Sequence, residues 1–212
     1  MIVTMGLARF RETVLFGQYS FPKGLYYGGK GFEQSAEVMN NLLCKAIVDF
    51  EDIMLIDTHS GYGPRYQMTL VNSVHEERDS DDLQKAFDYP QVAKTDPDEY
   101  YQMQGDMVDY LYLLKKELFP EKRLYATSFE FGTYGDSLRM SLRSYKAMIN
   151  ENRLFHYGAK NDRVAQQARI DFDELFNPQE MHWREKAIQD ARQALSGIIR
   201  AEGFGSDQKS SE

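Results

Sequence analysis

The feature that most constrains the fold of this chain is a short, unbroken apolar run at residues 53–56 (Ile-Met-Leu-Ile), followed directly by Asp57, Thr58 and His59. A continuous apolar run of this length is typical of a strand covered on both faces, as in an α/β sheet, whereas a half-exposed strand alternates apolar and polar residues. Further strands are expected at 66–71 and 123–133. Helices are expected at 33–50, at 98–118, from the loop after residue 133 to about 150, and at 180–202.

This alternation of strands and helices predicts an α/β fold, a layered α/β/α sandwich around a mixed, mostly parallel sheet. Two or three strands are few for such a sheet, so we expect exposed edges, an exposed apolar flank and self-association. The remaining segments are less regular. They are read as an amphipathic or ill-fitting start (1–16), a glycine-rich loop with positive φ angles (17–32), an acidic surface excursion (75–98), mixed polar turns (151–178) and a frayed tail (203–212).

Composition narrows the class of protein. Of 212 residues, 42% are apolar, which is enough for a core and excludes wholesale disorder. The formal net charge is −8 and no segment mixes basic with aromatic residues, so a nucleic-acid partner is not expected. No apolar run approaches the length of a membrane span, and the first residues lack a signal-peptide pattern, which predicts a soluble cytoplasmic protein. The single cysteine, Cys44, is read as a small buried apolar residue.

The first candidate for chemistry is the polar end of the apolar run. In open α/β sheets, ligands bind beyond the carboxyl ends of the strands. Strand side chains alternate, so Asp57 and His59 are expected on the same side of the sheet. A neutral imidazole there could bind a metal ion while a carboxylate orients it. The alternative is a hydrogen-bonded histidine with a structural role only.

The second candidate is Glu130, which stands between Phe129 and Phe131 near the end of a predicted strand. Burying a carboxylate is costly unless it is paired or functional. Partial burial would raise its pKa, which suits a general base acting on a metal-bound water. The alternative is an ordinary glutamate on an exposed face of the sheet.

Other polar clusters give weaker signals. The acidic segment 75–82 lacks the spacing of a calcium loop, and the glycines of 28–31 match neither a phosphate-binding loop nor a dinucleotide fingerprint. His182 is expected to be structural. No serine lies in a Gly-x-Ser-x-Gly elbow, so nucleophilic catalysis is unsupported.

Five segments resemble the zinc carboxypeptidase superfamily, which includes carboxypeptidase A, succinylglutamate desuccinylase and aspartoacylase. The segment 56–64 (Ile-Asp-Thr-His-Ser-Gly-Tyr-Gly-Pro) resembles the strand with the last zinc-binding histidine. The segment 129–134 (Phe-Glu-Phe-Gly-Thr-Tyr) resembles the strand with the catalytic glutamate. Segments 17–29 and 154–158 and the final helix near Trp183 are also similar to one branch of that superfamily.

The resemblance implies that residues 17–202 are the C-terminal part of a zinc-carboxypeptidase-like catalytic domain. It implies that His59 is a zinc ligand, with Asp57 beside it, and that Glu130 is the catalytic general base. The implied reaction is hydrolysis of an amide bond in a small peptide or an N-acylated amino acid. No residue is assigned to substrate binding.

The chain also departs from that superfamily. Its first two metal ligands form a His-x-x-Glu motif ahead of the loop that starts here at Gly17. The 16 residues before Gly17 contain no histidine and only Glu12. Since catalytic zinc sites use three protein ligands, we expect this chain alone to bind zinc poorly and to be inactive. Three alternatives stay open: an enzyme completed by a complementing chain or further sequence, a non-catalytic remnant or binding protein, and a rebuilt site using His59, Glu130 and a carboxylate of the acidic segment.

Overall fold

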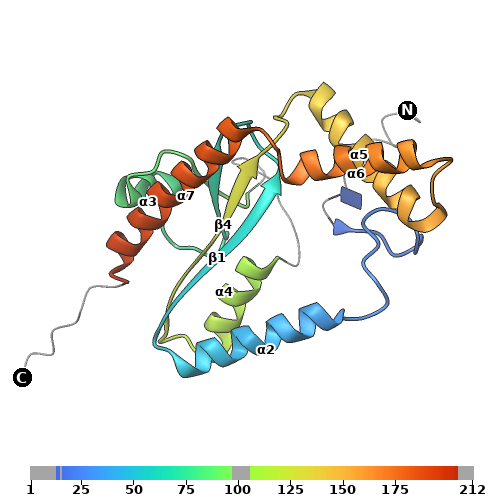
Figure 1. The fold of residues 1–212 in the computed structure, drawn as a ribbon. Coiled ribbons are helices and arrows are strands. Elements are labelled where there is room, and N and C mark those ends of the chain that lie inside the picture. The colour runs from blue at the N-terminus through green and yellow to red at the C-terminus, as the bar shows by residue number, and fades with distance from the viewer. Residues whose placement is uncertain (1–12, 15, 97–105, 205–212) are drawn as a thin grey trace, which may run out of the picture.

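The fold is an open sheet of four strands with helices on both faces (Figure 1). The computed structural model describes residues 13–14, 16–96 and 106–204. The strands are β1 (Asp52–Gly61), β2 (Met68–Asn72), β3 (Val92–Lys94) and β4 (Arg123–Gly132). The helices are α2 (Gln34–Asp49), α3 (Ser80–Phe87), α4 (Met107–Leu118), α5 (Leu138–Tyr157), α6 (Asp162–Phe176) and α7 (Met181–Glu202).

The sheet has the order β1-β4-β2-β3. The two long strands β1 and β4 are parallel and pair in register from Asp52 with Arg123 to Gly61 with Gly132. Strand β2 is antiparallel to β4 and parallel to β3. Two of the three pairings are therefore parallel, and the predicted α/β fold around a mixed, mostly parallel sheet is confirmed.

Alternate side chains of β4 enter two different cores. Tyr125 and Phe129 join Met68 and Leu70 of β2 under α3 and α7. On the opposite face, Ala126 packs with Ile53 of β1 under α2 and α4, whose buried residues include Leu43, Ile47, Val108 and Leu111. In β1, Met54 and Ile56 likewise pack against the first cluster and Ile53 and Leu55 belong to the second. Both faces of this part of β1 are thus covered, which explains its apolar run without alternation.

The interpretation of residues 75–98 as a surface excursion was wrong. The segment contains α3 and β3, and Leu83, Phe87 and Tyr89 are fully or almost fully buried. Helix α3 is short, and its first turn carries Asp81 and Asp82. Its two buried apolar residues, Leu83 and Phe87, are one helical turn apart, which is too few to give a clear apolar pattern among the charged residues.

The interpretation of residues 151–178 as mixed turns was also wrong. Helix α5 continues to Tyr157, and α6 begins after Asn161, whose side chain accepts a hydrogen bond from the Val164 backbone N–H. These two helices pack on each other and bury few residues, namely Ala147 in α5 and Ala168 and Leu175 in α6. The predicted helices 33–50 and 180–202 are confirmed as α2 and α7.

The glycine-rich loop before α2 has the expected positive φ angles at Gly17 and Gly29, and also at Tyr26. The Gln18 side chain closes the loop by donating to the carbonyl oxygens of Phe21 and Leu25. Most of the expected segment 1–16, the first turns of the expected helix 98–118 and residues 205–212 of the tail lie outside the described residues. Helix α4 is described from Met107, with Asp106 as its N-cap.

Several apolar side chains remain exposed on α2 and directly after it, among them Val38, Leu42, Val48 and Phe50. Cys44, expected to be buried, is only half-buried on this helix, and its thiol donates to Asn40 Oδ1. In the described part of the chain, no helix combines the length and the apolar character needed to cross a membrane. Self-association through exposed apolar surface stays a prediction.

Candidate functional site

One face of the β1–β4 pair changes from apolar to polar along its length. Near the amino ends of the strands, Ile53 and Leu55 of β1 and Leu124 and Ala126 of β4 pack under α2 and α4. The next residues on that same face, by strand alternation, are Asp57 and His59 in β1 and Ser128 and Glu130 in β4. The carboxyl end of the sheet therefore presents titratable groups where its amino end presents a core.

Register places the two main candidate residues side by side. His59 and Glu130 are direct partners in the β1–β4 ladder. The imidazole Nδ1 of His59 lies 4.0 Å from Oε2 of Glu130, and its Nε2 lies 2.8 Å from Oδ2 of Asp57. The structure thus brings together all three residues that the sequence singled out, and it assigns a different neighbour to each ring nitrogen.

Burial differs sharply within this group. The Glu130 side chain is only 5% exposed, whereas those of His59 and Asp57 are 38% and 28% exposed. The backbone N–H of Tyr62 donates to Glu130 Oε1 at 3.2 Å. A buried carboxylate is consequently held at one oxygen by the chain just after β1 and faces His59 with the other.

Three glycines allow the conformation and packing of the loop that carries Tyr62. Two of them flank Tyr62 in the chain, and the third lies at the end of β4. Gly61 and Gly63 have φ angles of 134° and 100°, which residues with side chains rarely adopt. The backbone of Pro64 approaches Gly132 so closely that a Cβ atom there would lie 2.0 Å from the Pro64 carbonyl oxygen. The packing of this loop on the end of β4 therefore fixes the hydrogen bond to Glu130.

The His59–Asp57 pair shifts the pKa values of both groups. The hydrogen bond to Asp57 raises the pKa of His59, against the effect of partial burial, and the charges of Asp57, Glu130 and Asp106 add to the rise. The hydrogen bond from His59 lowers the pKa of Asp57 despite burial. The histidine is thus held as a hydrogen-bond donor to Asp57 through Nε2, which leaves Nδ1 directed toward Glu130.

Asp106 is a residue near the site that the sequence reasoning missed. It is the N-cap of α4, and its Oδ1 accepts a hydrogen bond from the Asp109 backbone N–H at 2.8 Å. Its Oδ2 is buried without a hydrogen-bond partner among the described residues, and burial raises its pKa. An aspartate ahead of an apolar helical stripe is a capping signal, so the sequence could have placed it at the start of α4.

The donor atoms of the site fit a zinc ion only in part. An imidazole held by a carboxylate at one nitrogen, with the other nitrogen directed toward a second carboxylate, suits one metal ligand with its orienting partner. A catalytic zinc ion needs three protein ligands. Within residues 13–14, 16–96 and 106–204, no group of three or more histidine, cysteine, aspartate or glutamate side chains is placed to hold an ion. The described residues therefore do not make a complete zinc site.

The weaker candidates have other partners. Glu76 of the acidic segment is bound by Arg78 and by the hydroxyl of Tyr112, so this one carboxylate of the segment already has partners away from His59. The exposed ring of His182 lies 5.2 Å from the ring of Tyr66 at a tilt of 47°, and its structural role stays a prediction.

Comparison with known proteins gave one result at the level of the family. The model of a family described as "Protein of unknown function (DUF2817)" matches residues 1–190, a range that includes the whole candidate site. Neither the curated proteins nor the solved structures contain a match.

Proposed function

We propose that this chain, which belongs to the DUF2817 family, is a metal-dependent hydrolase related to the zinc carboxypeptidase superfamily. The proposed reaction is cleavage of an amide bond in a small peptide or an N-acyl amino acid. The observation that carries this proposal is the pairing of His59 with the buried Glu130 at the carboxyl end of two parallel strands. Asp57, bound to the far side of the imidazole, supports the same assignment.

Glu130 has the surroundings expected of a general base. Its carboxylate lies beneath the surface, where water does not screen it fully, and a backbone N–H fixes Oε1. Its Oε2 faces the histidine. A water molecule held beside His59 could transfer a proton to Glu130, and the same carboxyl group could then protonate the leaving amine.

His59 acts in this proposal as one metal ligand, kept in a single orientation by Asp57. Zinc, when bound, would polarise the scissile carbonyl and lower the pKa of a bound water. Because the described residues supply one such ligand, the other two must come from outside them or from a complementing chain, and we assign no reaction step to the metal here.

The proposal is tested on the full chain, purified together with any complementing chain that binds it, with and without added zinc. Metal analysis and hydrolysis of a panel of dipeptides and N-acetyl amino acids are the measurements. We expect Glu130→Gln to reduce hydrolysis by at least ~100-fold while zinc content is kept. His59→Ala should lose the zinc. The matched control is Glu77→Gln, since Glu77 is an exposed glutamate outside the site, and it should behave as the unaltered protein.

Two results would count against the hydrolase. Hydrolysis that is unchanged in Glu130→Gln would remove Glu130 from the role of base. Zinc content near zero after incubation with the metal, together with no hydrolysis of any panel member, would favour a non-catalytic binding protein that retains this part of the fold.

A further inference from the structure

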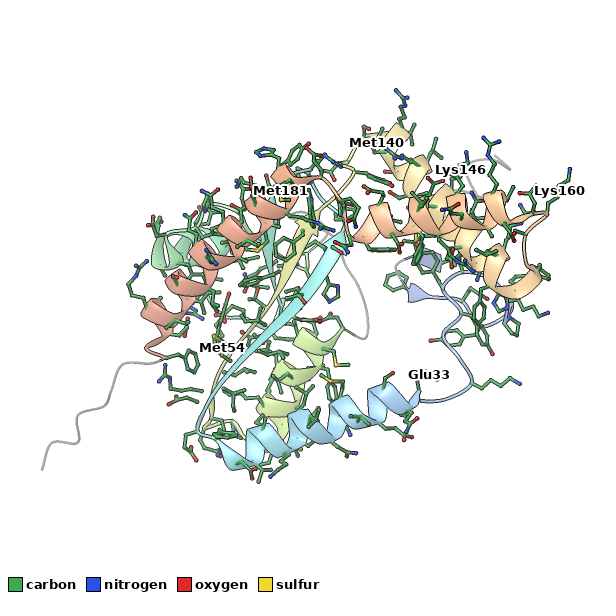
Figure 2. The ribbon with its side chains drawn as sticks, in the orientation of Figure 1. Glu33, Met54, Met140, Lys146, Lys160 and Met181 are labelled. Carbon is green, nitrogen blue, oxygen red and sulfur yellow. The ribbon has the colours of Figure 1, made fainter. Side chains whose placement is uncertain are left out.

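A second feature of the molecule lies away from His59 and Glu130. Helices α5 and α6 and the connection 158–161 line an open cavity of about 640 Å³. Four cationic side chains line it: Lys146 and Arg153 from α5, Lys160 from the connection and Arg163 from α6. Figure 2 shows Lys146 and Lys160 at the end of the molecule that α5 and α6 form.

These four cations differ from a set of cations that form ion pairs elsewhere in the molecule. Arg65, Arg78, Arg123, Lys122 and Lys186 each lie within 4.0 Å of a carboxylate. No such ion pair occurs for the four cations of the cavity in the part of the chain that the structure describes. The chain as a whole has 33 acidic and 25 basic residues, so the gathering of four cations around one cavity runs against its composition.

The rest of the lining suits an organic ligand with negative charge. Leu154, Val164 and Ala168 supply apolar surface, and Asn150 and Gln167 supply amide groups. Asp171 also lines the cavity, and its carboxylate accepts a hydrogen bond from Gln167 at 2.9 Å. A volume of this size is in the range of sites for small molecules.

We propose that this cavity binds a small organic molecule carrying several phosphate groups. Guanidinium and ammonium groups are the side chains that most often bind phosphate, and four of them around one cavity match a multiply charged ligand better than a single carboxylate. The cavity is separate from the candidate site: α6 rises ~20 Å between Arg163 and Phe176, and it is Phe176 whose carbonyl oxygen accepts a hydrogen bond from Ser60 of β1.

Isothermal titration calorimetry of the full chain with ATP and with tripolyphosphate, in metal-free buffer at fixed salt, tests this proposal. Lys160→Gln combined with Arg163→Gln should weaken ATP binding by at least about tenfold, because charge-assisted hydrogen bonds to phosphate are lost. The matched control combines Arg139→Gln with Arg169→Gln. These arginines are exposed on α5 and α6 but do not line the cavity, so binding should change less than about twofold.

Circular dichroism of both double variants should match the unaltered protein, which separates loss of binding from loss of fold. If ATP binds more tightly than tripolyphosphate, the claim that the ligand is an organic molecule is supported. If the two probes bind equally, that claim is overturned. Equal weakening in the two double variants, or no binding of either probe at millimolar concentration, overturns the proposal. Binding of duplex DNA or of phosphatidylserine vesicles alone overturns it in favour of a macromolecular polyanion.

Discussion

Asp57 and His59, two residues apart on β1, form a hydrogen bond of 2.8 Å along one face of the strand. This contact does not depend on the tertiary fold, because the alternation of side chains along a strand puts residues 57 and 59 on the same side of the sheet. What the tertiary fold adds is the third group, Glu130 on β4, which stands at the other ring nitrogen. The pair therefore decides which nitrogen of His59 faces the candidate base.

We predict that Asp57→Asn lowers the pKa of His59, because the hydrogen bond to Asp57 is the main cause of its rise. The NMR titration of the imidazole protons measures this directly. The other three histidines, His75, His156 and His182, lie outside this pair and serve as internal controls for the measurement. An unchanged His59 titration would show that the hydrogen bond does not set its pKa.

The same pair gives a pH dependence of stability. The lowered pKa of Asp57 stabilises the folded state above the unfolded value of ~3.9 and loses this effect as the pH falls. The raised pKa of His59 stabilises it below the unfolded value of ~6.5 and loses this effect as the pH rises. The pair therefore contributes most between roughly pH 4 and 6.5, by no more than ~1 kcal/mol because both groups are partly exposed. Urea unfolding of Asp57→Asn across that range measures the difference.

We predict that Gly132→Ala destabilises the protein by about 1–3 kcal/mol, since the new Cβ would overlap the backbone of Pro64. Relief of the overlap requires the loop after β1 to move, which carries the Tyr62 N–H away from Glu130. Thermal unfolding measures the loss. Gly31→Ala is the control, because a Cβ at Gly31 meets nothing within 4 Å, and a similar loss in both variants would contradict the steric explanation.

We predict that Arg78→Met destabilises the protein by about 1–3 kcal/mol, because it leaves the buried carboxylate of Glu76 and the partly buried carboxylate of Glu202 without their cation. Burial alone would raise the pKa of Glu76, but the hydrogen bonds from Arg78 and Tyr112 hold it below its ordinary value. The stabilisation is thus present above the unfolded pKa of ~4.3 and is lost as the pH falls.

Urea unfolding at neutral and acidic pH tests the Arg78 prediction, and the deficit of the variant should shrink at low pH. Lys45→Met removes an exposed ion pair with Asp49 on α2 and should cost less than ~1 kcal/mol. A deficit that is the same at both pH values would mean that Arg78 acts through its packing over the rings of Tyr125 and Phe87 rather than through charge.

The sequence predicted the elements whose apolar pattern is strong and local. The apolar run at 53–56 and the apolar stripes of α2 and α7 can each be recognised within their own segment. The predicted bounds of the two helices, 33–50 and 180–202, differ from the observed bounds by one residue at most. Helix α3 was missed because two buried residues, Leu83 and Phe87, are surrounded by charge. Helix α5 was predicted too short and helix α6 was missed. Both bury few residues of their own, and these residues form a shared cluster around Tyr134, Ala147 and Leu175.

The candidate site was predictable in part for the same reason. Strand alternation was enough to relate Asp57 to His59. The side-by-side position of His59 and Glu130 depends on parallel pairing between strands that are 71 residues apart, which periodicity cannot give. The hydrogen bond from Tyr62 depends on the close approach at Gly132, and the position of Asp106 depends on how α4 packs, so neither follows from local sequence.

The place of β1 at the outer edge of the described strands has one more consequence. The strand is held in line by a single neighbour, β4, and its side chains alternate between two faces. Sliding β1 by one position along β4 would turn His59 toward α7 and bring Thr58 or Ser60, neither able to serve as an imidazole, opposite the carboxylate of Glu130. An insertion or deletion of one residue within 53–56 would therefore abolish the site while leaving every one of its side chains in the protein.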